Sequence, residues 1–292
     1  MQWPIQVQGR LIERSEVDWI KQSMRENPHM GRTPLSVKVC ERWDWRRSDG
    51  QLKDIACREL LRKLEKLELL RLPARQTGGG SCKAPQIATV PVDDSPICCT
   101  LKQLGVLKMV NVDDSANIND KGLFNYLLKQ YHYLGFVRPV GQNMKYLIYS
   151  SHGRVLGCLL FGAAAWKTQG RDTYIGWSPQ QREKHLGLLT NNTRFLILPW
   201  VNVKHLASCV LAMCLRCLNR DWMQKYGSEL ALVETFVDTE RFKGTCYRAS
   251  NWLFVGQTKG RSRQDRYGCK KVPIKDTYVY PLEKDFRKLL CD

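Results

Sequence analysis

The chain has few acidic residues for the number of basic ones it carries. Its 292 residues include 28 Asp and Glu against 46 Lys and Arg, which leaves a formal net charge of +18 at pH 7. Like charges in this excess repel one another in the folded state, and a polyanion relieves that repulsion while it releases counterions. The imbalance predicts a nucleic-acid partner, with DNA the expected one. The alternative is a basic protein whose cations are only solvated.

Long apolar runs are also missing. No stretch approaches the roughly 18 apolar residues that cross a bilayer, and the opening Met1-Gln2-Trp3-Pro4 lacks the basic-then-apolar pattern of a signal peptide. We therefore expect a cytoplasmic protein with no membrane contact.

Cysteine is too sparse for a disulfide scaffold, at 12 residues in the chain. Cys214 and Cys217, with Cys209 nearby, have a spacing found in zinc sites, but they lie in an apolar run that reads as a helix. No second pair follows at a distance suited to four tetrahedral ligands. Core packing is the preferred interpretation, and no metal site is predicted from these thiols.

Residues 1–75 read as a helical domain. Apolar residues recur at helical spacing in three segments, which begin near Ser15, at Thr33-Pro34 and after Gly50, and residues 69–73 resemble a short strand. Three helices and a strand predict a winged helix-turn-helix. Its third helix would present Lys53, Arg58 and Arg62 to DNA. The alternative is an accessory three-helix bundle with solvated cations.

Residues 76–110 are rich in Gly and Pro and predict a linker, whereas residues 111–292 alternate helix and strand patterns. The fold class expected for this second domain is α/β with a mixed sheet. The expected helices cover residues 123–134, 178–189, 206–223 and 243–250. The expected strands cover residues 146–150, 155–163, 195–201, 230–237 and 253–257.

The order strand, long helix, strand, short helix, strand over residues 195–257 resembles the core of the GNAT acetyltransferases. In that family a turn of the type Gln/Arg-x-x-Gly-x-Gly/Ala places helix amides against the pyrophosphate of acetyl-CoA. The matching turn here, at residues 202–207, keeps only the last small residue, Ala207. Lys204 and His205 are the candidate cofactor-binding residues. Because His205 stands where the family has Gly, we expect acetyl-CoA to bind weakly or not at all.

A second GNAT landmark is a Tyr four residues ahead of a Gly-Phe pair, and Tyr247 has this position ahead of Asn251-Trp252. The resemblance implies that such a Tyr protonates the departing thiolate, with Glu234 as the candidate base. The alternative is that Tyr247 packs its helix and that Glu234 pairs with Arg248 or Arg194. An acyl-CoA-dependent acyltransferase is therefore one of three functions that stay open.

A likeness of wider extent covers nearly the whole chain. The phrases that carry it are LSVKVCERWDWRRSDGQLKDIACRELLRKLE, YIGWS, NNTRFLILPWVNVKHLAS and ETFVDTERFKGTCYRASNWLFVGQTKGRSR. They resemble the DruA family, whose members include a component of the Druantia anti-phage system and relatives that accompany transposase-like proteins. The resemblance implies a defence or mobile-element setting, with DNA as the object and other defence-system proteins as partners.

Residues 241–271 are the most basic segment, with nine Lys and Arg against one Asp. Aromatic residues alternate with these cations, which suits a phosphate backbone with a base stacked nearby. A solvated basic loop is the alternative. The candidate nucleic-acid-binding residues here are Arg248, Trp252, Lys259, Arg261, Arg263 and Arg266.

The third open function is a metal-dependent DNA nickase or transposase-like enzyme. Glu234 and Asp238 lie four residues apart on an expected strand and so share a face, where they would hold Mg²⁺. Tyr247 would be the nucleophile. No recognised nuclease signature accompanies them.

The basic segment should supply much of the affinity for DNA. Replacing Lys259, Arg261 and Arg263 by Ala removes up to three phosphate contacts, so the slope of log K against log salt should flatten by roughly two to three units. Gel-shift titrations at several salt concentrations measure that slope. An unaltered slope would mean that this segment is only a solvated surface.

Overall fold

The computed structural model describes residues 3–7, 10–46, 50–74, 87–260 and 272–292. The chain divides into two compact units, Met1–Gln86 and Ile87–Asp292, and each is described by itself. In the described part of the chain, no helix combines the length and the apolar character needed to cross a membrane.

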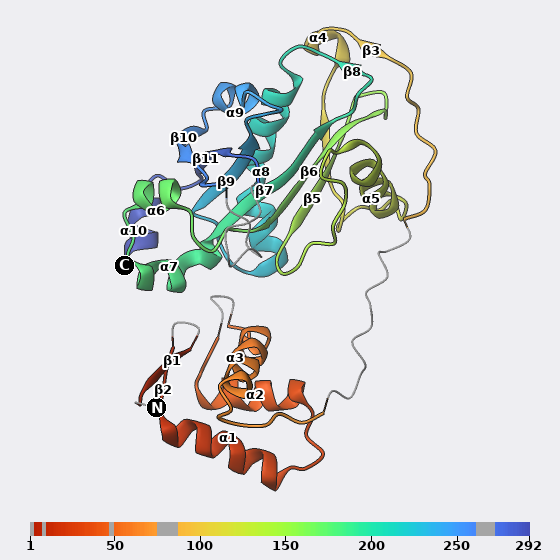
Figure 1. Ribbon diagram of the computed structural model, residues 1–292. Coiled ribbons are helices and arrows are strands. Elements are labelled where there is room, and N and C mark those ends of the chain that lie inside the picture. The colour runs from red at the N-terminus through yellow and green to blue at the C-terminus, as the bar shows by residue number, and fades with distance from the viewer. Residues whose placement is uncertain (1–2, 8–9, 47–49, 75–86, 261–271) are drawn as a thin grey trace. The chain divides into compact units, whose positions relative to one another are not determined.

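The N-terminal unit is a short hairpin followed by three helices (Figure 1). Its elements are β1 (Ile5–Val7), β2 (Arg10–Ile12), α1 (Arg14–Glu26), α2 (Arg32–Arg42) and α3 (Asp54–Lys66). The three predicted helices are present, and their buried faces share one apolar core. Leu35, Leu60 and Leu64 are fully buried in it.

The strand predicted at residues 69–73 is wrong, because this segment is irregular. Leu70 and Leu72 are buried in the core, and the Leu72 amide donates to Glu65 Oε1 at 2.9 Å rather than to a neighbouring strand. The hairpin of β1 and β2 instead precedes the first helix. A wing after the third helix is therefore not found among the described residues, and the winged-helix assignment remains a prediction.

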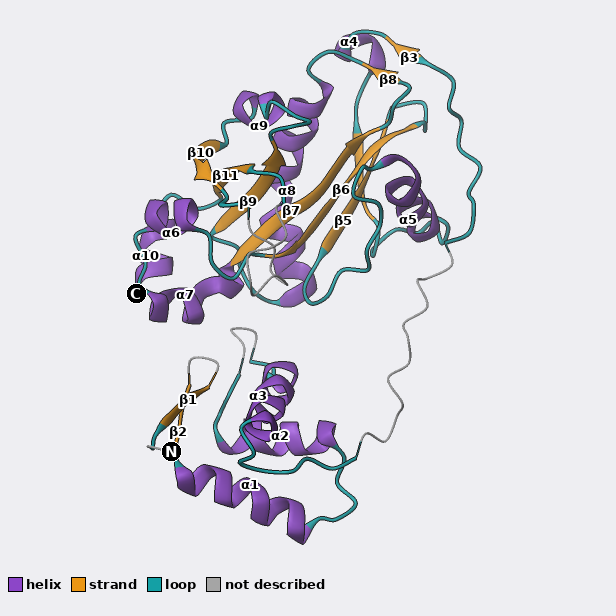
Figure 2. Cartoon of the chain, in the orientation of Figure 1, coloured by secondary structure: helices purple, strands orange, loops and turns teal. Residues whose placement is uncertain are grey.

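The C-terminal unit is built on a seven-stranded mixed sheet with the order β10-β11-β9-β7-β6-β5-β4 (Figure 2). All neighbouring strands in it are antiparallel except β7 and β9, which are parallel. The strands of this sheet are β4 (Lys108–Asn111), β5 (Met144–Tyr149), β6 (Val155–Ala163), β7 (Leu189–Ile197), β9 (Leu232–Asp238), β10 (Leu253–Gln257) and β11 (Lys275–Pro281). Two further strands, β3 (Ile97–Cys98) and β8 (Val201–Asn202), pair with each other.

Helices cover both faces of the sheet, with α5 in front of β5 and β6 and α8 behind β7 and β9 (Figure 1). The helices of this unit are α4 (Leu101–Leu104), α5 (Asp120–Tyr131), α6 (Gln169–Ile175), α7 (Pro179–His185), α8 (Leu206–Tyr226), α9 (Thr245–Ala249) and α10 (Phe286–Cys291), with a 3₁₀ turn at Leu186–Leu188. This is the α/β class with a mixed sheet that the sequence predicts. The succession β7, α8, β9, α9, β10 is the order on which the GNAT resemblance rests.

Several features of this unit differ from the sequence-based expectation. The strand expected at residues 195–201 is β7, which runs from Leu189 to Ile197, the helix expected over residues 178–189 ends at His185, and α6 was not expected. Residues 97–110, assigned to the linker, belong to the second unit, where the Ile97 amide donates to the Trp200 carbonyl at 2.8 Å. Strand β11 was not expected, yet it lies between β9 and β10. Only its central residues 277–279 are buried, so its sequence lacks a long apolar run.

The parallel strands β7 and β9 separate along their length. Their pairing covers only Leu189–Asn192 against Leu232–Thr235, although β7 continues to Ile197 and β9 to Asp238. Each strand therefore carries several residues beyond the point where the hydrogen-bonded ladder ends. This gap in the sheet is where the candidate site lies.

The close approach of β6 and β7 gives a test of the packing. A Cβ added at Gly157 would lie 2.2 Å from the Leu196 carbonyl oxygen, whereas a Cβ at Gly162 would meet only Thr193 Cγ2, at 3.6 Å. We expect Gly157→Ala to lower the free energy of unfolding by about 1–3 kcal/mol, as overpacking does. Gly162→Ala, on the same strand, is the control. Denaturant unfolding that finds both variants equally stable would contradict this packing.

Candidate functional site

A pocket of about 560 Å³ lies where β7 and β9 separate. Its volume is in the range of sites that hold small molecules and cofactors. Most of the lining comes from four segments, namely residues 131–134 at the end of α5, residues 191–197 of β7, residues 235–238 of β9, and residues 244–247 at the start of α9. Pro199, Ala207, Phe242 and Lys275 complete it. The site is therefore built from the end of one helix, two diverging strands and a short helix.

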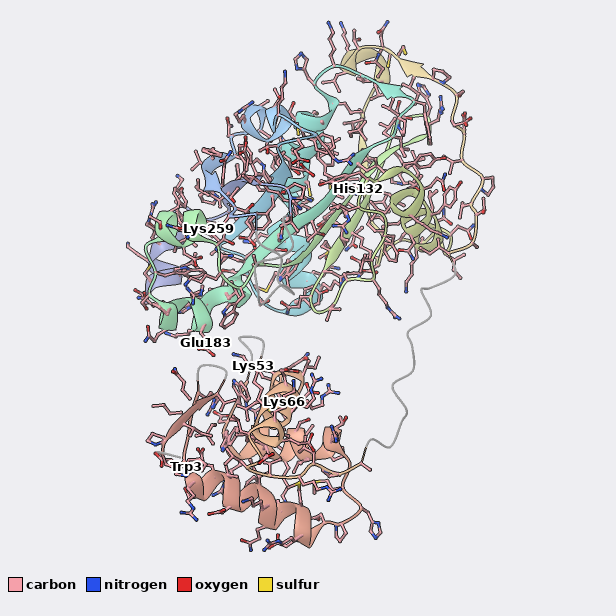
Figure 3. All side chains as sticks on the ribbon, viewed as in Figure 1. Trp3, Lys53, Lys66, His132, Glu183 and Lys259 are labelled. Atoms are coloured by element: carbon pink, nitrogen blue, oxygen red, sulfur yellow. The ribbon has the colours of Figure 1, made fainter. Side chains whose placement is uncertain are left out.

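Aromatic rings and an arginine gather at one side of the pocket. Tyr133 and Phe242 are 38% and 51% exposed, and their ring centroids are 5.5 Å apart. The Arg241 guanidinium carbon lies 5.1 Å from the centroid of the Tyr133 ring, at cation–π distance. His132, labelled in Figure 3, stacks on Tyr133, with the two ring centroids 4.9 Å apart. Exposed rings beside a cation can bind a flat or anionic ligand.

The pocket lining has more positively charged side chains than negatively charged ones. Arg194 is partly buried, and burial lowers its pKa. It donates from Nε to the Gly135 carbonyl at 3.1 Å and from Nη1 to the Thr193 carbonyl at 2.8 Å. Lys275 also lines the pocket, against Asp238 as the one carboxylate among the lining residues. The lining thus has a net positive charge.

His132 is neutral near pH 7. Burial and the neighbouring Arg194 lower its pKa to about 4. Its Nδ1 accepts a hydrogen bond from the Leu134 amide at 3.1 Å, so the ring proton lies on Nε2. The ring therefore supplies a single fixed hydrogen-bond donor.

Three of the polar residues that line the pocket are hydrogen-bonded to one another. The Tyr247 hydroxyl donates to Asn192 Oδ1 at 2.7 Å, and the Thr235 hydroxyl donates to the Asn192 carbonyl at 3.0 Å. Tyr247 is 8% exposed, and burial raises its pKa. Tyr247 lines the pocket, and its hydroxyl is engaged with Asn192, so its catalytic role remains a prediction.

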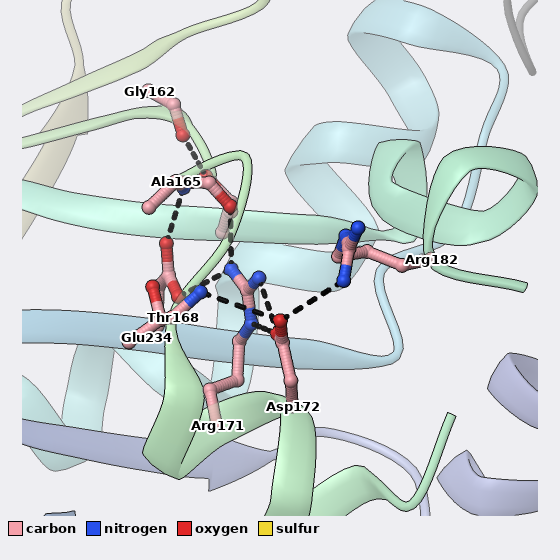
Figure 4. Close-up of polar contacts among 8 residues, drawn as sticks. Gly162, Ala165, Thr168, Arg171, Asp172, Arg182 and Glu234 are labelled. Carbon is pink, nitrogen blue, oxygen red and sulfur yellow. Dashed lines mark hydrogen bonds and ion pairs between the residues drawn. The ribbon is translucent and has the colours of Figure 1, made fainter. Parts of the chain in front are cut away.

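Glu234 lies apart from the pocket, in a buried ion-pair network (Figure 4). Its Oε2 accepts from Arg171 Nη1 at 2.8 Å and its Oε1 from the Ala165 amide at 2.5 Å. Both side chains are fully buried, and Arg171 also pairs with Asp172. Burial raises the pKa of Glu234, although Arg171 and the Ala165 amide favour its charged form. The predicted partners Arg248 and Arg194 are wrong, since the partner is Arg171.

The pair Glu234 and Asp238 does not fit one Mg²⁺. Four residues along a strand span about 13 Å, whereas Mg²⁺ requires ligands at about 2 Å, so the shared face puts the two carboxylates too far apart. Only Asp238 lines the pocket, where its Oδ1 accepts from the Glu240 amide at 3.1 Å. Within the described part of the chain, no group of three or more His, Cys, Asp or Glu residues is placed to hold a metal ion.

The turn before α8 has a backbone conformation that Gly usually adopts, although His205 stands at that position. His205 has φ +65°, in the left-handed region, and its side chain is exposed, as is that of Lys204. The His205 carbonyl accepts from the Cys209 amide at 3.0 Å. Lys204 and His205 are therefore accessible at the start of α8, near Ala207, which lines the pocket.

Trp252 is a core residue, and its predicted role in stacking on a base is wrong. It is 3% exposed and packs edge-on against Tyr247 at 5.1 Å between ring centroids. Arg248 and Lys259 are exposed, as expected for cations that meet phosphate, and Figure 3 labels Lys259 at the surface. Arg261, Arg263 and Arg266 lie outside the described residues.

The predicted cations of the N-terminal unit are differently placed. Arg58 pairs with Asp54 at 3.0 Å and Arg62 with Glu59, both within α3. Lys53 is the N-cap residue of the same helix. Neutralisation within the helix lowers the net positive charge that this face offers to DNA.

Sequence reasoning missed the pocket residues His132, Tyr133, Arg194 and Phe242, and with them Arg241, which lies against the Tyr133 ring. Two of the short segments that hold them carry a recognisable signal. His132-Tyr133 follows α5 directly, and Arg241-Phe242 follows β9 within four residues. Rings and cations placed just after an element ends are typical of binding loops. Their meeting across more than 100 residues requires the fold.

The comparisons with known proteins point to one family. The family model for the Druantia protein DruA matches residues 97–269, more than half of the chain. No curated protein matches the chain.

Among solved structures, a spermidine N-acetyltransferase from Vibrio cholerae in complex with CoA and spermine is similar at 8% identity and a TM-score of 0.40, over 60% of this chain and 95% of that one. The spermidine/spermine N-acetyltransferase SpeG from the same organism, in complex with manganese ions, is similar at 8% identity and a TM-score of 0.36, over 62% and 96%. Likeness at this level says nothing about ligands.

The core position of Trp252 leads to a stability prediction. We expect Trp252→Ala to lower the free energy of unfolding by about 3–5 kcal/mol, since it leaves a cavity among packed aromatic rings. Trp166 is 53% exposed, so Trp166→Ala should change stability by less than about 1 kcal/mol. Thermal or urea unfolding compares the two. A stable Trp252→Ala variant with weakened DNA binding would restore the stacking role.

Proposed function

Because the chain belongs to the DruA family of Druantia proteins, we propose that it binds DNA as part of an anti-phage defence or mobile-element system. The binding surface is the C-terminal unit, at the end of β9 and around α9. The GNAT-like fold here serves as a scaffold for nucleic acid, and other proteins of the same system are its expected partners.

The observation that carries the proposal is a set of exposed cations beside the pocket. Lys243 and Arg248 flank the pocket residues Gly244 and Tyr247 in the chain, and both are exposed. Neither forms an ion pair with another described residue, whereas the cations of α3 are paired within their helix. The Arg248 side chain is held by a hydrogen bond from Nη2 to the Lys243 carbonyl at 2.9 Å.

Free cations on one surface suit a phosphate backbone. Each phosphate that such a cation neutralises releases a condensed counterion, which is the main source of affinity for DNA at moderate salt. Lys259, within the most basic segment of the sequence at residues 241–271, is also exposed. The formal charge of +18 provides the long-range attraction that brings the strand to this surface.

Acyl transfer is the second candidate function, and the position of the pocket supports it. The pocket opens between the two parallel strands and reaches Ala207 at the start of α8, the part of the fold that the GNAT resemblance assigns to acetyl-CoA. His205 in place of Gly argues against close approach of a pyrophosphate. The metal-dependent nickase has weaker support, because Glu234 is paired with Arg171 and lies apart from Asp238.

The proposal predicts a local loss of DNA affinity. The double variant Lys243→Gln with Arg248→Gln removes two phosphate contacts, so the slope of log K against log salt for a duplex should fall by about two units. The control is Lys284→Gln with Lys288→Gln, which removes the same charge from exposed positions at α10. Fluorescence anisotropy at several salt concentrations measures both slopes.

Equal slopes for the two double variants would show that the attraction is a general effect of net charge. A wild-type chain that binds no duplex or single strand at low salt would overturn the proposal itself.

A further inference from the structure

We propose that the pocket between β7 and β9 takes one nucleotide of an unpaired strand, with the base inside and its phosphate on the Arg241 side. The inference rests on the proposed function and names the ligand of its central site. The cations around α9 would hold the flanking backbone.

The pocket has the size and the lining that a base requires. Its volume of about 560 Å³ is ample for one nucleotide, and apolar and aromatic side chains such as Phe195 and Tyr247 line it. Those two rings meet edge to face at 6.4 Å between centroids. A flat ring entering from the mouth would therefore contact aromatic groups.

Tyr133 and Phe242 provide the stacking surface at the mouth. Both line the pocket, and both remain largely exposed although the core nearby is well packed. Their planes are inclined at 59°, so neither ring covers the face of the other. Arg241 and His132 lie against Tyr133, and Tyr133 is the one ring in contact with Phe242 among the described residues, so Phe242 adds the more open face. Stacking of a base on such rings accepts any of the four bases, which suits binding without sequence preference.

Two guanidinium groups, those of Arg241 and Arg194, are available to bind the phosphate. Arg241 is 59% exposed, and its nearest carboxylate atom, Asp238 Oδ2, is 3.9 Å from Nε, too far for a hydrogen bond. Arg194, deeper in the pocket, uses Nε and Nη1 on backbone carbonyls. A phosphate group here would receive donors that the protein alone leaves unused, and the neutral His132 adds a third donor at Nε2.

The position of the pocket between β7 and β9 favours unpaired nucleic acid. A base inside a duplex reaches such a pocket only after it is unstacked and unpaired, at a cost of a few kcal/mol. A single strand has no base pair to break. The inference therefore predicts that the pocket residues contribute to binding of single strands and that duplex binding depends on the surface cations.

The test compares pocket and surface aromatics in the full-length chain, with labelled oligothymidylate and a labelled duplex as probes. Tyr133→Ala should weaken single-strand binding by roughly 5- to 100-fold, because it removes a stacked ring. The affinity for the duplex should stay within about twofold of the wild-type value, and so should the slope of log K against log salt. Tyr133→Phe keeps the ring and should retain the affinity. The matched control is Trp166→Ala, since Trp166 is an exposed ring beside Arg182, outside the pocket lining.

Arg241→Gln tests the phosphate position separately. It should flatten the single-strand salt slope by about 0.7, the value of one phosphate contact on a single strand. Excess acetyl-CoA should leave the bound oligothymidylate in place.

Three results would overturn the inference while duplex binding remains intact. Tyr133→Ala could behave like Trp166→Ala, it could weaken duplex and single-strand binding equally, or acetyl-CoA could displace the oligothymidylate and so assign the pocket to an acyl-CoA. Loss of all binding by the wild-type chain is a different result, because it overturns the proposed function as well. Melting curves of each variant confirm that the comparison is between folded proteins.

Discussion

The incomplete pairing of β7 and β9 is the constraint on which the site depends. Parallel strands that stay paired along their whole length leave no room between them, whereas these two share a ladder only from Leu189 to Asn192 and from Leu232 to Thr235. Beyond that point their side chains border a pocket. The residues at the separation, Asn192 and Thr235, are joined by a hydrogen bond from the Thr235 hydroxyl to the Asn192 carbonyl.

The buried ion pair of Arg171 and Glu234 anchors β9 next to Thr235, which lines the pocket. Two fully buried charges are tolerated only when paired and hydrogen-bonded, and here Arg171 also bonds Asp172 and the Ala165 carbonyl. Glu234 immediately precedes Thr235, so the network ties α6 to the strand that forms one wall of the pocket. A carboxylate that the sequence suggests as a catalytic base is thereby an anchor of the scaffold.

The charges of the two units are used differently. In α3 the arginines expected to contact DNA are each matched by a carboxylate three or four residues away. Around α9 the cations Lys243 and Arg248 have no such match among the described residues, and they adjoin a pocket with exposed rings. Net charge alone does not distinguish these cases, because a cation that is already paired with a carboxylate is less available to neutralise a phosphate and release the counterion condensed on the DNA.

The sequence by itself determined the basic character, the three helices of the N-terminal unit, the helices α5, α7, α8 and α9, five strands of the seven-stranded sheet and the family. These features follow from local periodicity, turn residues and long distinctive phrases, which neighbours along the chain specify. Only the tertiary structure decided that Trp252 is core, that Glu234 pairs with Arg171 and that β11 enters between β9 and β10. It also brought Tyr133 beside Phe242, 109 positions away in the chain. Such contacts depend on how strands are ordered in a sheet, and the period of one segment carries no information about its partner.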